Sequence, residues 1–222
     1  MSAQAHARTR AAGSRRRPTK AQRQRRRKVF RRRALLLAFA VLISCAALAV
    51  IVRPFADKAV QEISLPLRHE DIIRQQAAQK GLDPSLIAGV IYVESRFRDQ
   101  TSHAGAKGLM QIMPATADHI ADKSGGTAFE QGDLATPQVN IAYGSWYLRY
   151  LIGHYNGNQM LAVAAYNAGE DNVDKWVTRA GGPSNFNADS DIPFPETRAY
   201  VQGVLDKRDA YAHNYAKELG LK

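Results

Sequence analysis

The chain has 222 residues, enough for one domain of ordinary size with additional segments, and its formal net charge is +11. Residues 1–33 hold 14 Lys and Arg and no acidic residue, so residues 34–222 carry a net charge of −3. A nucleic-acid-binding domain carries its basic charge on the fold itself, whereas here the charge belongs to the N-terminal tail. We therefore expect no specific nucleic-acid partner.

The N-terminal segments predict a membrane anchor. Residues 1–33 are too polar and too uniformly charged to fold, and we expect a disordered basic tail. Residues 34–52 contain no charge, and at ~1.5 Å per residue such a helix nearly crosses the ~30 Å hydrocarbon core of a bilayer. The arginine-rich flank predicts a single-pass protein with a cytoplasmic N-terminus and the rest of the chain on the extracytoplasmic side.

Two other interpretations of the apolar run are weaker. A cleaved signal peptide has a shorter apolar core and a small-residue cleavage site, whereas this run continues to Val52 without one. Leu42 to Cys45 resembles a bacterial lipobox, which would make Cys45 a lipid-bearing N-terminus. A mature lipoprotein usually begins with polar residues, and apolar residues follow Cys45 here, so we favour the uncleaved anchor. Cys45 is the only cysteine, which excludes a disulfide framework and a cysteine metal site.

The remaining sequence predicts helices with clear boundaries. Residues 53–66 form a juxtamembrane linker, a helical continuation that ends before Pro66. Asp83-Pro84 and Thr136-Pro137 each pair a helix cap with a proline at the first helical position. No segment alternates like a strand, so we expect residues 67–222 to form an all-α domain. Its predicted helices are residues 67–80, 83–95, 114–126, 137–154, 158–169 and 196–219, and residues 181–195 form a loop long enough to be functional or mobile.

One carboxyl lies on an apolar helix face. In the predicted helix 83–95, Ile87, Val90, Ile91 and Glu94 fall at positions i, i+3, i+4 and i+7. Desolvation on this inward face would raise the pKa of Glu94, which suits a general acid that works near neutral pH. The alternative is a solvated carboxylate paired with a nearby arginine.

Four sequence blocks occur in one known order. They are Glu94-Ser95 with GLMQIMP (108–114), NIAYGSWYL (140–148), AYNAG (165–169) and FPETRAYV (194–201). Together they resemble the catalytic domain of the SLT-type lytic transglycosylases, and the resemblance covers about residues 67–215. It implies an all-α, lysozyme-like fold shared with goose-type lysozyme.

The resemblance also implies roles for individual residues. Glu94 matches the catalytic acid that protonates the glycosidic oxygen. Tyr166 matches the tyrosine beside that acid, close either to the carboxyl or to the acetamido group of the substrate. The substrate-binding positions that the resemblance implies are Ser102, Gly108, Gln111, Met113, Tyr166 and Asn167. His103 departs from the family pattern, where proline is common, and this leaves the rigidity of its loop open. No cofactor and no metal are implied.

The number of carboxyls bears on the reaction. Ordinary glycosidases use two carboxylates, and Asp99, Asp118 and Asp133 lie in polar or turn-like contexts. In the family the C6 hydroxyl of muramic acid replaces water, and one glutamate acts first as acid and then as base. We therefore predict a membrane-anchored lytic transglycosylase that cleaves the MurNAc–GlcNAc β-1,4 bond of peptidoglycan glycan strands with formation of 1,6-anhydro ends. The alternatives are a hydrolytic muramidase and a non-catalytic peptidoglycan-binding module.

A group of aromatic residues follows helix spacing within residues 137–154. Tyr143, Trp146, Tyr147 and Tyr150 are expected mainly in the core. The alternative is that some of them stack on sugar rings at the edge of the groove.

Overall fold

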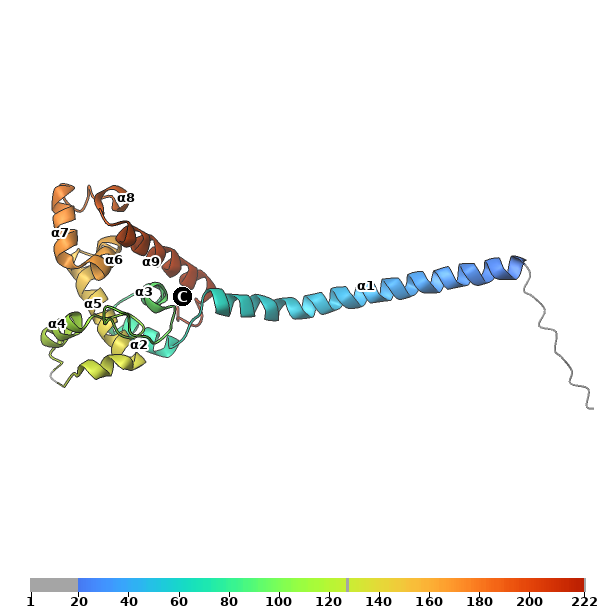
Figure 1. Cartoon of the computed structure of the whole chain (residues 1–222), viewed down its shortest axis with the longest axis horizontal. Coiled ribbons are helices and arrows are strands. Elements are labelled where there is room, and N and C mark those ends of the chain that lie inside the picture. The colour runs from blue at the N-terminus through green and yellow to red at the C-terminus, as the bar shows by residue number, and fades with distance from the viewer. Residues whose placement is uncertain (1–19, 127, 222) are drawn as a thin grey trace, which may run out of the picture. The chain divides into compact units, whose positions relative to one another are not determined.

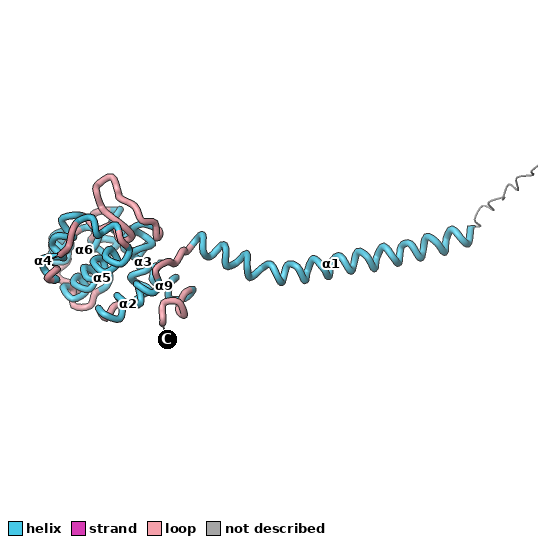
Figure 2. The backbone as a smooth tube through the Cα atoms, turned by 90° about the horizontal axis from the view of Figure 1, so that it is seen from below, coloured by secondary structure: helices cyan, strands magenta, loops and turns pink. Residues whose placement is uncertain are grey.

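The computed structural model describes residues 20–126 and 128–221. Among these residues no strand occurs, and only two isolated β-bridges link Lys107 to Thr101 and Ile112. The chain divides into two units, residues 1–59 and 60–222. The elements, shown in Figures 1 and 2, are α1 (Lys20–Ser64), α2 (Glu70–Lys80), α3 (Pro84–Ser95), α4 (Pro114–Ser124), the 3-10 helix η1 (Gln131–Ala135), α5 (Pro137–His154), α6 (Gln159–Ala168), α7 (Glu170–Arg179), α8 (Ala188–Asp191) and α9 (Pro195–Asn214).

Helix α1 contains the predicted membrane span. By length and composition, its part from Gln24 to Ser64 is apolar and long enough to cross a membrane. The helix begins at Lys20, so residues 20–33 are helical where the sequence predicted disorder. Arg, Lys, Gln and Ala are good helix formers, and they extend a helix already nucleated in the apolar run. Residues 1–19 of the predicted tail lie outside the described residues. The predicted helix end before Pro66 is confirmed, since α1 ends at Ser64.

Most helix boundaries follow the sequence signals. The side chain of Asp83 caps α3 by accepting a hydrogen bond from the backbone N–H of Ser85 at 2.8 Å. Helix α2 begins at Glu70 instead of residue 67, because His69 has a left-handed backbone with φ 59°. The predicted side-chain cap at Thr136 is absent, since its hydroxyl donates to the carbonyl of Asp133.

The C-terminal third differs more from the sequence prediction. Helix α7 follows Gly169 directly and had not been predicted, although it buries Val173 and Trp176 on one face. The predicted loop 181–195 contains the short helix α8. Helix α9 ends at Asn214 instead of residue 219.

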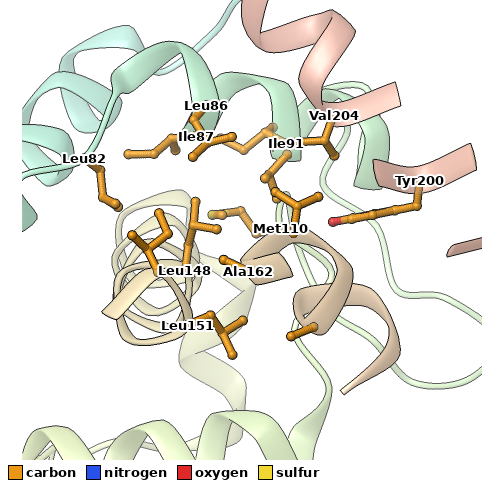
Figure 3. Packing of buried hydrophobic residues seen from close by; sticks show 14 of the residues in the cluster. Leu82, Leu86, Ile87, Ile91, Met110, Leu148, Leu151, Ala162, Tyr200 and Val204 are labelled. Atoms are coloured by element: carbon orange, nitrogen blue, oxygen red, sulfur yellow. The ribbon is translucent and has the colours of Figure 1, made fainter. Parts of the chain in front are cut away.

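The core is built around α3 and α9. Helix α3 packs extensively against α9, and a Cβ at Gly89 would lie only 2.9 Å from the carbonyl oxygen of Val204 on α9. Figure 3 shows Ile87 and Ile91 of α3, Leu148 of α5 and Val204 of α9 in the same cluster. The tight crossing fixes the end of α3, where Glu94 lies, against α9.

Candidate active site

Glu94 lies in the last turn of α3, half-buried behind a fully buried apolar face. The hydroxyl of Tyr200 on α9 donates a hydrogen bond of 2.6 Å to Oε1 of Glu94. Tyr200 is itself buried, and Figure 3 shows it among the core residues beside Val204. The carboxyl is therefore held by the same helix pair that forms the core.

Two opposing effects set the protonation of Glu94. Burial disfavours the charged form and raises the pKa of Glu94 from 4.5 to about 7, while the hydrogen bond from Tyr200 lowers it. Within residues 20–126 and 128–221, no second carboxylate contributes to the shift. The predicted direction of the pKa shift is confirmed, and the group is poised to give and take a proton near neutral pH.

The hydroxyl of Tyr166 bonds to the backbone and not to Glu94. Its hydroxyl donates to the backbone carbonyl of Met110 at 3.1 Å. Burial and then the charge of Glu94 raise the pKa of Tyr166 well above its ordinary value. The tyrosine that hydrogen-bonds Glu94 is thus Tyr200, and the role of Tyr166 beside a catalytic acid, which the family resemblance implies, stays a prediction.

A pocket of about 250 Å³ adjoins Tyr166. It lies between α4, α5 and the end of α6, and Glu94 is not among its lining residues. Four of the predicted substrate-binding residues line it: Gln111, Met113, Tyr166 and Asn167. Tyr166 is thus a pocket residue whose pKa also responds to the charge of Glu94.

The pocket residues are fixed by local contacts. Gln111 has a left-handed backbone with φ 48°, and its Nε2 donates to the carbonyls of Gln100 and Gly108 at 3.0 and 2.7 Å. Asn167 accepts a hydrogen bond of 2.8 Å from the hydroxyl of buried Thr197 on α9. Met113 is 41% exposed just before α4, so an apolar side chain is open to solvent beside the pocket.

The other two predicted substrate-binding residues, Ser102 and Gly108, lie in the loop before α4 and do not line the pocket. The Ser102 hydroxyl accepts a hydrogen bond from the backbone N–H of Ala106 at 3.0 Å. A Cβ at Gly108 would lie 2.1 Å from Nδ2 of Asn140, so this packing alone accounts for the glycine. Ser102 and Gly108 remain predictions as glycan-contacting residues.

Two residues of the site were missed from the sequence. Tyr200 belongs to the block FPETRAYV, but no role was assigned to it. Asn140 opens the block NIAYGSWYL and is 1% exposed. Its Oδ1 accepts from the backbone N–H of Met110 at 2.8 Å, and its Nδ2 donates to the carbonyls of Lys107 and Leu134. A buried amide in the first turn of an apolar helix was the available signal, because such a group needs partners.

A family model described as the transglycosylase SLT domain matches residues 71–188, more than half of the chain. The chain belongs to this family. The soluble lytic murein transglycosylase of Escherichia coli (strain K12) is 35% identical over 153 residues, which cover 68% of this chain and 24% of that protein. The membrane-bound lytic murein transglycosylase C of Actinobacillus pleuropneumoniae serotype 5b (strain L20) is 35% identical over 164 residues, which cover 64% of this chain and 45% of that protein.

Solved structures of the family share the fold. The structure of an inactive mutant of the lytic transglycosylase Slt from Pseudomonas aeruginosa matches 69% of this chain with a TM-score of 0.62 and 35% identity. The match covers 25% of that protein, so the chain spans about a quarter of this relative and of the Escherichia coli relative. The predicted SLT family and the predicted lysozyme-like, all-α fold are confirmed. The membrane-bound relative and the apolar helix α1 together suggest membrane association.

Proposed function

We propose that this protein is a peptidoglycan lytic transglycosylase that cleaves the MurNAc–GlcNAc β-1,4 bond with Glu94 as its single acid and base. The observation that carries the proposal is the placement of Glu94, a half-buried carboxyl in the last turn of α3 whose Oε1 accepts a hydrogen bond of 2.6 Å from the hydroxyl of Tyr200. Burial raises the pKa of this carboxyl to about 7, so a substantial fraction is protonated at neutral pH and can donate in the first half of the reaction, and the carboxylate left behind accepts a proton in the second half. Burial and the hydrogen bond from Tyr200 are the two causes of this pKa shift, and no carboxylate is among them.

The hydrogen bond from Tyr200 assigns the two oxygens of the acid. Oε1 accepts from Tyr200, so the proton of the neutral acid lies on Oε2. Oε2 protonates the glycosidic oxygen, and the bond between that oxygen and the anomeric carbon breaks. The C6 hydroxyl of the same muramic acid then bonds to the anomeric carbon and returns its proton to Oε2. The cycle closes without net loss of a proton and without water.

The pocket residues hold the glycan beside the acid in this proposal. Gln111, Met113, Tyr166 and Asn167 line the pocket and offer amide, hydroxyl and apolar contacts. Such a mixture suits a sugar, which has apolar ring faces and polar edges. Positioning by several fixed side chains lowers the entropic cost of reaching the transition state.

The anchor would place this activity at the membrane. We propose that α1 crosses the cytoplasmic membrane once, with residues 1–33 in the cytoplasm and residues 53–222 on the outer side. The Arg-rich flank of the span supports this orientation. The substrate class, peptidoglycan, lies on that side.

A test of the catalytic assignment uses the full chain in detergent on isolated sacculi. Glu94→Gln keeps the size of the side chain and removes the titrating proton, so release of soluble fragments should fall by at least about 10³-fold. Glu196→Gln, at an exposed position of α9, is the matched control and should retain activity. Digestion by Glu94→Gln at the wild-type rate would show that the acid lies elsewhere or that the protein only binds glycan.

A further inference from the structure

Helix α5 carries a row of aromatic rings beyond the pocket. Trp146 and Tyr150 stack with ring centroids 5.7 Å apart and planes within 5° of each other. Tyr147 and Tyr150 are also nearly parallel, at 6.2 Å and 11°. All three rings are half-buried, whereas Leu148 and Leu151 of the same helix are fully buried. The sequence predicted these rings mainly for the core, but they lie at its edge.

The row is continuous with the candidate active site. Tyr147 lines the pocket, and its ring centroid lies 5.5 Å from that of Tyr166. The rings of Tyr166, Tyr147, Tyr150 and Trp146 are therefore linked in this order, from the pocket to the rest of the row. Each step is a direct ring-to-ring contact.

The size of the pocket leaves part of a glycan strand without a binding site. Its volume of about 250 Å³ is below the roughly 300–1,000 Å³ of sites that enclose a drug-sized ligand. A polymer seated there must continue over the neighbouring surface. The aromatic row is a surface adjacent to the pocket that offers flat apolar faces.

We infer that Trp146 and Tyr150 form an outer subsite that stacks one further sugar ring of the glycan strand. The apolar face of a pyranose suits an aromatic plane, and its hydroxyls remain free at the rim. A carboxylate also lies beside the row, since Oε2 of Glu170 is 3.8 Å from Nδ1 of His154, whose ring centroid lies 6.3 Å from that of Tyr150. Its oxygens can accept hydrogen bonds from sugar hydroxyls. The choice of a glycan as the ligand rests on the proposed function.

Tryptophan emission tests this subsite without catalysis. The chain has two tryptophans, and Trp176 is 4% exposed, so a ligand on the row should perturb Trp146. In the full-length Glu94→Gln variant, we expect a β-1,4-linked N-acetylglucosamine hexasaccharide to shift the emission. A disaccharide, which is too short to occupy the pocket and reach Trp146 at the same time, should leave it unchanged.

Four further variants in the Glu94→Gln background identify the source of the shift and test the contact. Trp146→Phe should abolish it while preserving binding, and Trp176→Phe should preserve it. Trp146→Ala should weaken hexasaccharide binding by about tenfold, the effect of losing an aromatic contact. Arg149→Ala, an exposed neighbour on the same helix, should leave the affinity unchanged.

These outcomes test the outer subsite independently of the proposed reaction. If neither the hexasaccharide nor glycan strands from sacculi shift the emission, or if Trp146→Ala binds both sugars as the parent does, the subsite is wrong. Equal weakening for the disaccharide and the hexasaccharide would also overturn it, because a general structural defect acts at every length. An emission shift from an enzyme that produces no anhydro ends would support the subsite and contradict the proposed reaction.

Discussion

At the scale of single residues, the Glu94 carboxyl is balanced between burial and the hydroxyl of Tyr200. Burial favours the protonated acid, and the hydrogen bond favours the carboxylate. The net pKa of about 7 lets one group perform two proton transfers in opposite directions. A fully solvated glutamate would be a weaker acid catalyst, because almost none of it is protonated at neutral pH.

Tyr200→Phe should move the pH profile in a defined direction. The free enzyme needs protonated Glu94, so kcat/KM should fall as pH rises through about 7. Loss of a hydrogen bond that favours the ionised form raises the pKa of Glu94, and the falling limb should move up by about one pH unit. The control is Tyr211→Phe, whose hydroxyl donates to the carbonyl of Pro66 instead. An unchanged limb, or one displaced to lower pH, would show that Tyr200 does not tune the acid.

Burial of Glu94 should also make stability depend on pH. Between about pH 4.5 and 7 the unfolded chain releases the Glu94 proton while the folded chain keeps it, so folding becomes less favourable as pH rises. Above about 7 both states are ionised and the loss stays constant. Glu94→Gln does not titrate and should gain stability relative to wild type across this window, by roughly 2 kcal/mol after allowance for partial exposure.

Denaturant unfolding of both proteins at pH 4 and pH 8 measures this difference. Glu196→Gln, an exposed control, should show no comparable gain between the two pH values. A Glu94→Gln variant that is less stable than wild type at pH 8 would mean that the ionised carboxylate stabilises the fold.

At the scale of elements, the conformation of the loop between α3 and α4 is stabilised by its packing against Asn140. Gly108→Ala would place a Cβ 2.1 Å from Nδ2 of Asn140 and 2.7 Å from the carbonyl of Leu134, at φ 75°. We expect a loss of at least about 2 kcal/mol of unfolding free energy from clash and strain together. Gly105→Ala is the matched control, since its φ is 87° but nothing lies within 4 Å of the added Cβ.

The comparison of the two alanine variants separates clash from backbone strain. Thermal unfolding should show a clearly larger loss for Gly108→Ala, together with weaker glycan binding, because the same loop holds Gln111. Equal losses of stability in both variants would mean that the close contact between Gly108 and Asn140 does not contribute to stability.

Local patterns in the sequence explain why some elements were predicted and others were not. The i, i+3, i+4 spacing places Glu94 on the buried face, and Asp83 with Pro84 fixes the start of α3. Tyr200 reaches Glu94 across 106 residues, a contact that no local periodicity reveals. The spacing of Val173 and Trp176 after Gly169 indicates helix α7, but the helix is short and its signal is weak. Residues 20–33 consist largely of good helix formers, but their uniform charge favoured a prediction of disorder.

At the scale of the whole molecule, the proposed orientation can be tested with cysteine labelling. In a Cys45→Ala background, new cysteines replace Ser14 in the predicted tail or Ser190, which is exposed on α8. A membrane-impermeant maleimide should label Ser190→Cys in spheroplasts, whereas Ser14→Cys should react only after lysis. The reverse pattern would contradict the orientation. Cys45→Ala alone should stay in the membrane fraction, and its release would instead favour a lipid anchor at Cys45.

The central claim is that a hydroxyl of the substrate, and not water, completes the reaction at Glu94. Mass spectrometry of the fragments that the full chain releases from isolated sacculi tests it most directly. The account predicts muropeptides that end in 1,6-anhydro-MurNAc, and the loss of these products in Glu94→Gln. Fragments with ordinary reducing MurNAc ends would contradict it and would identify a hydrolytic muramidase.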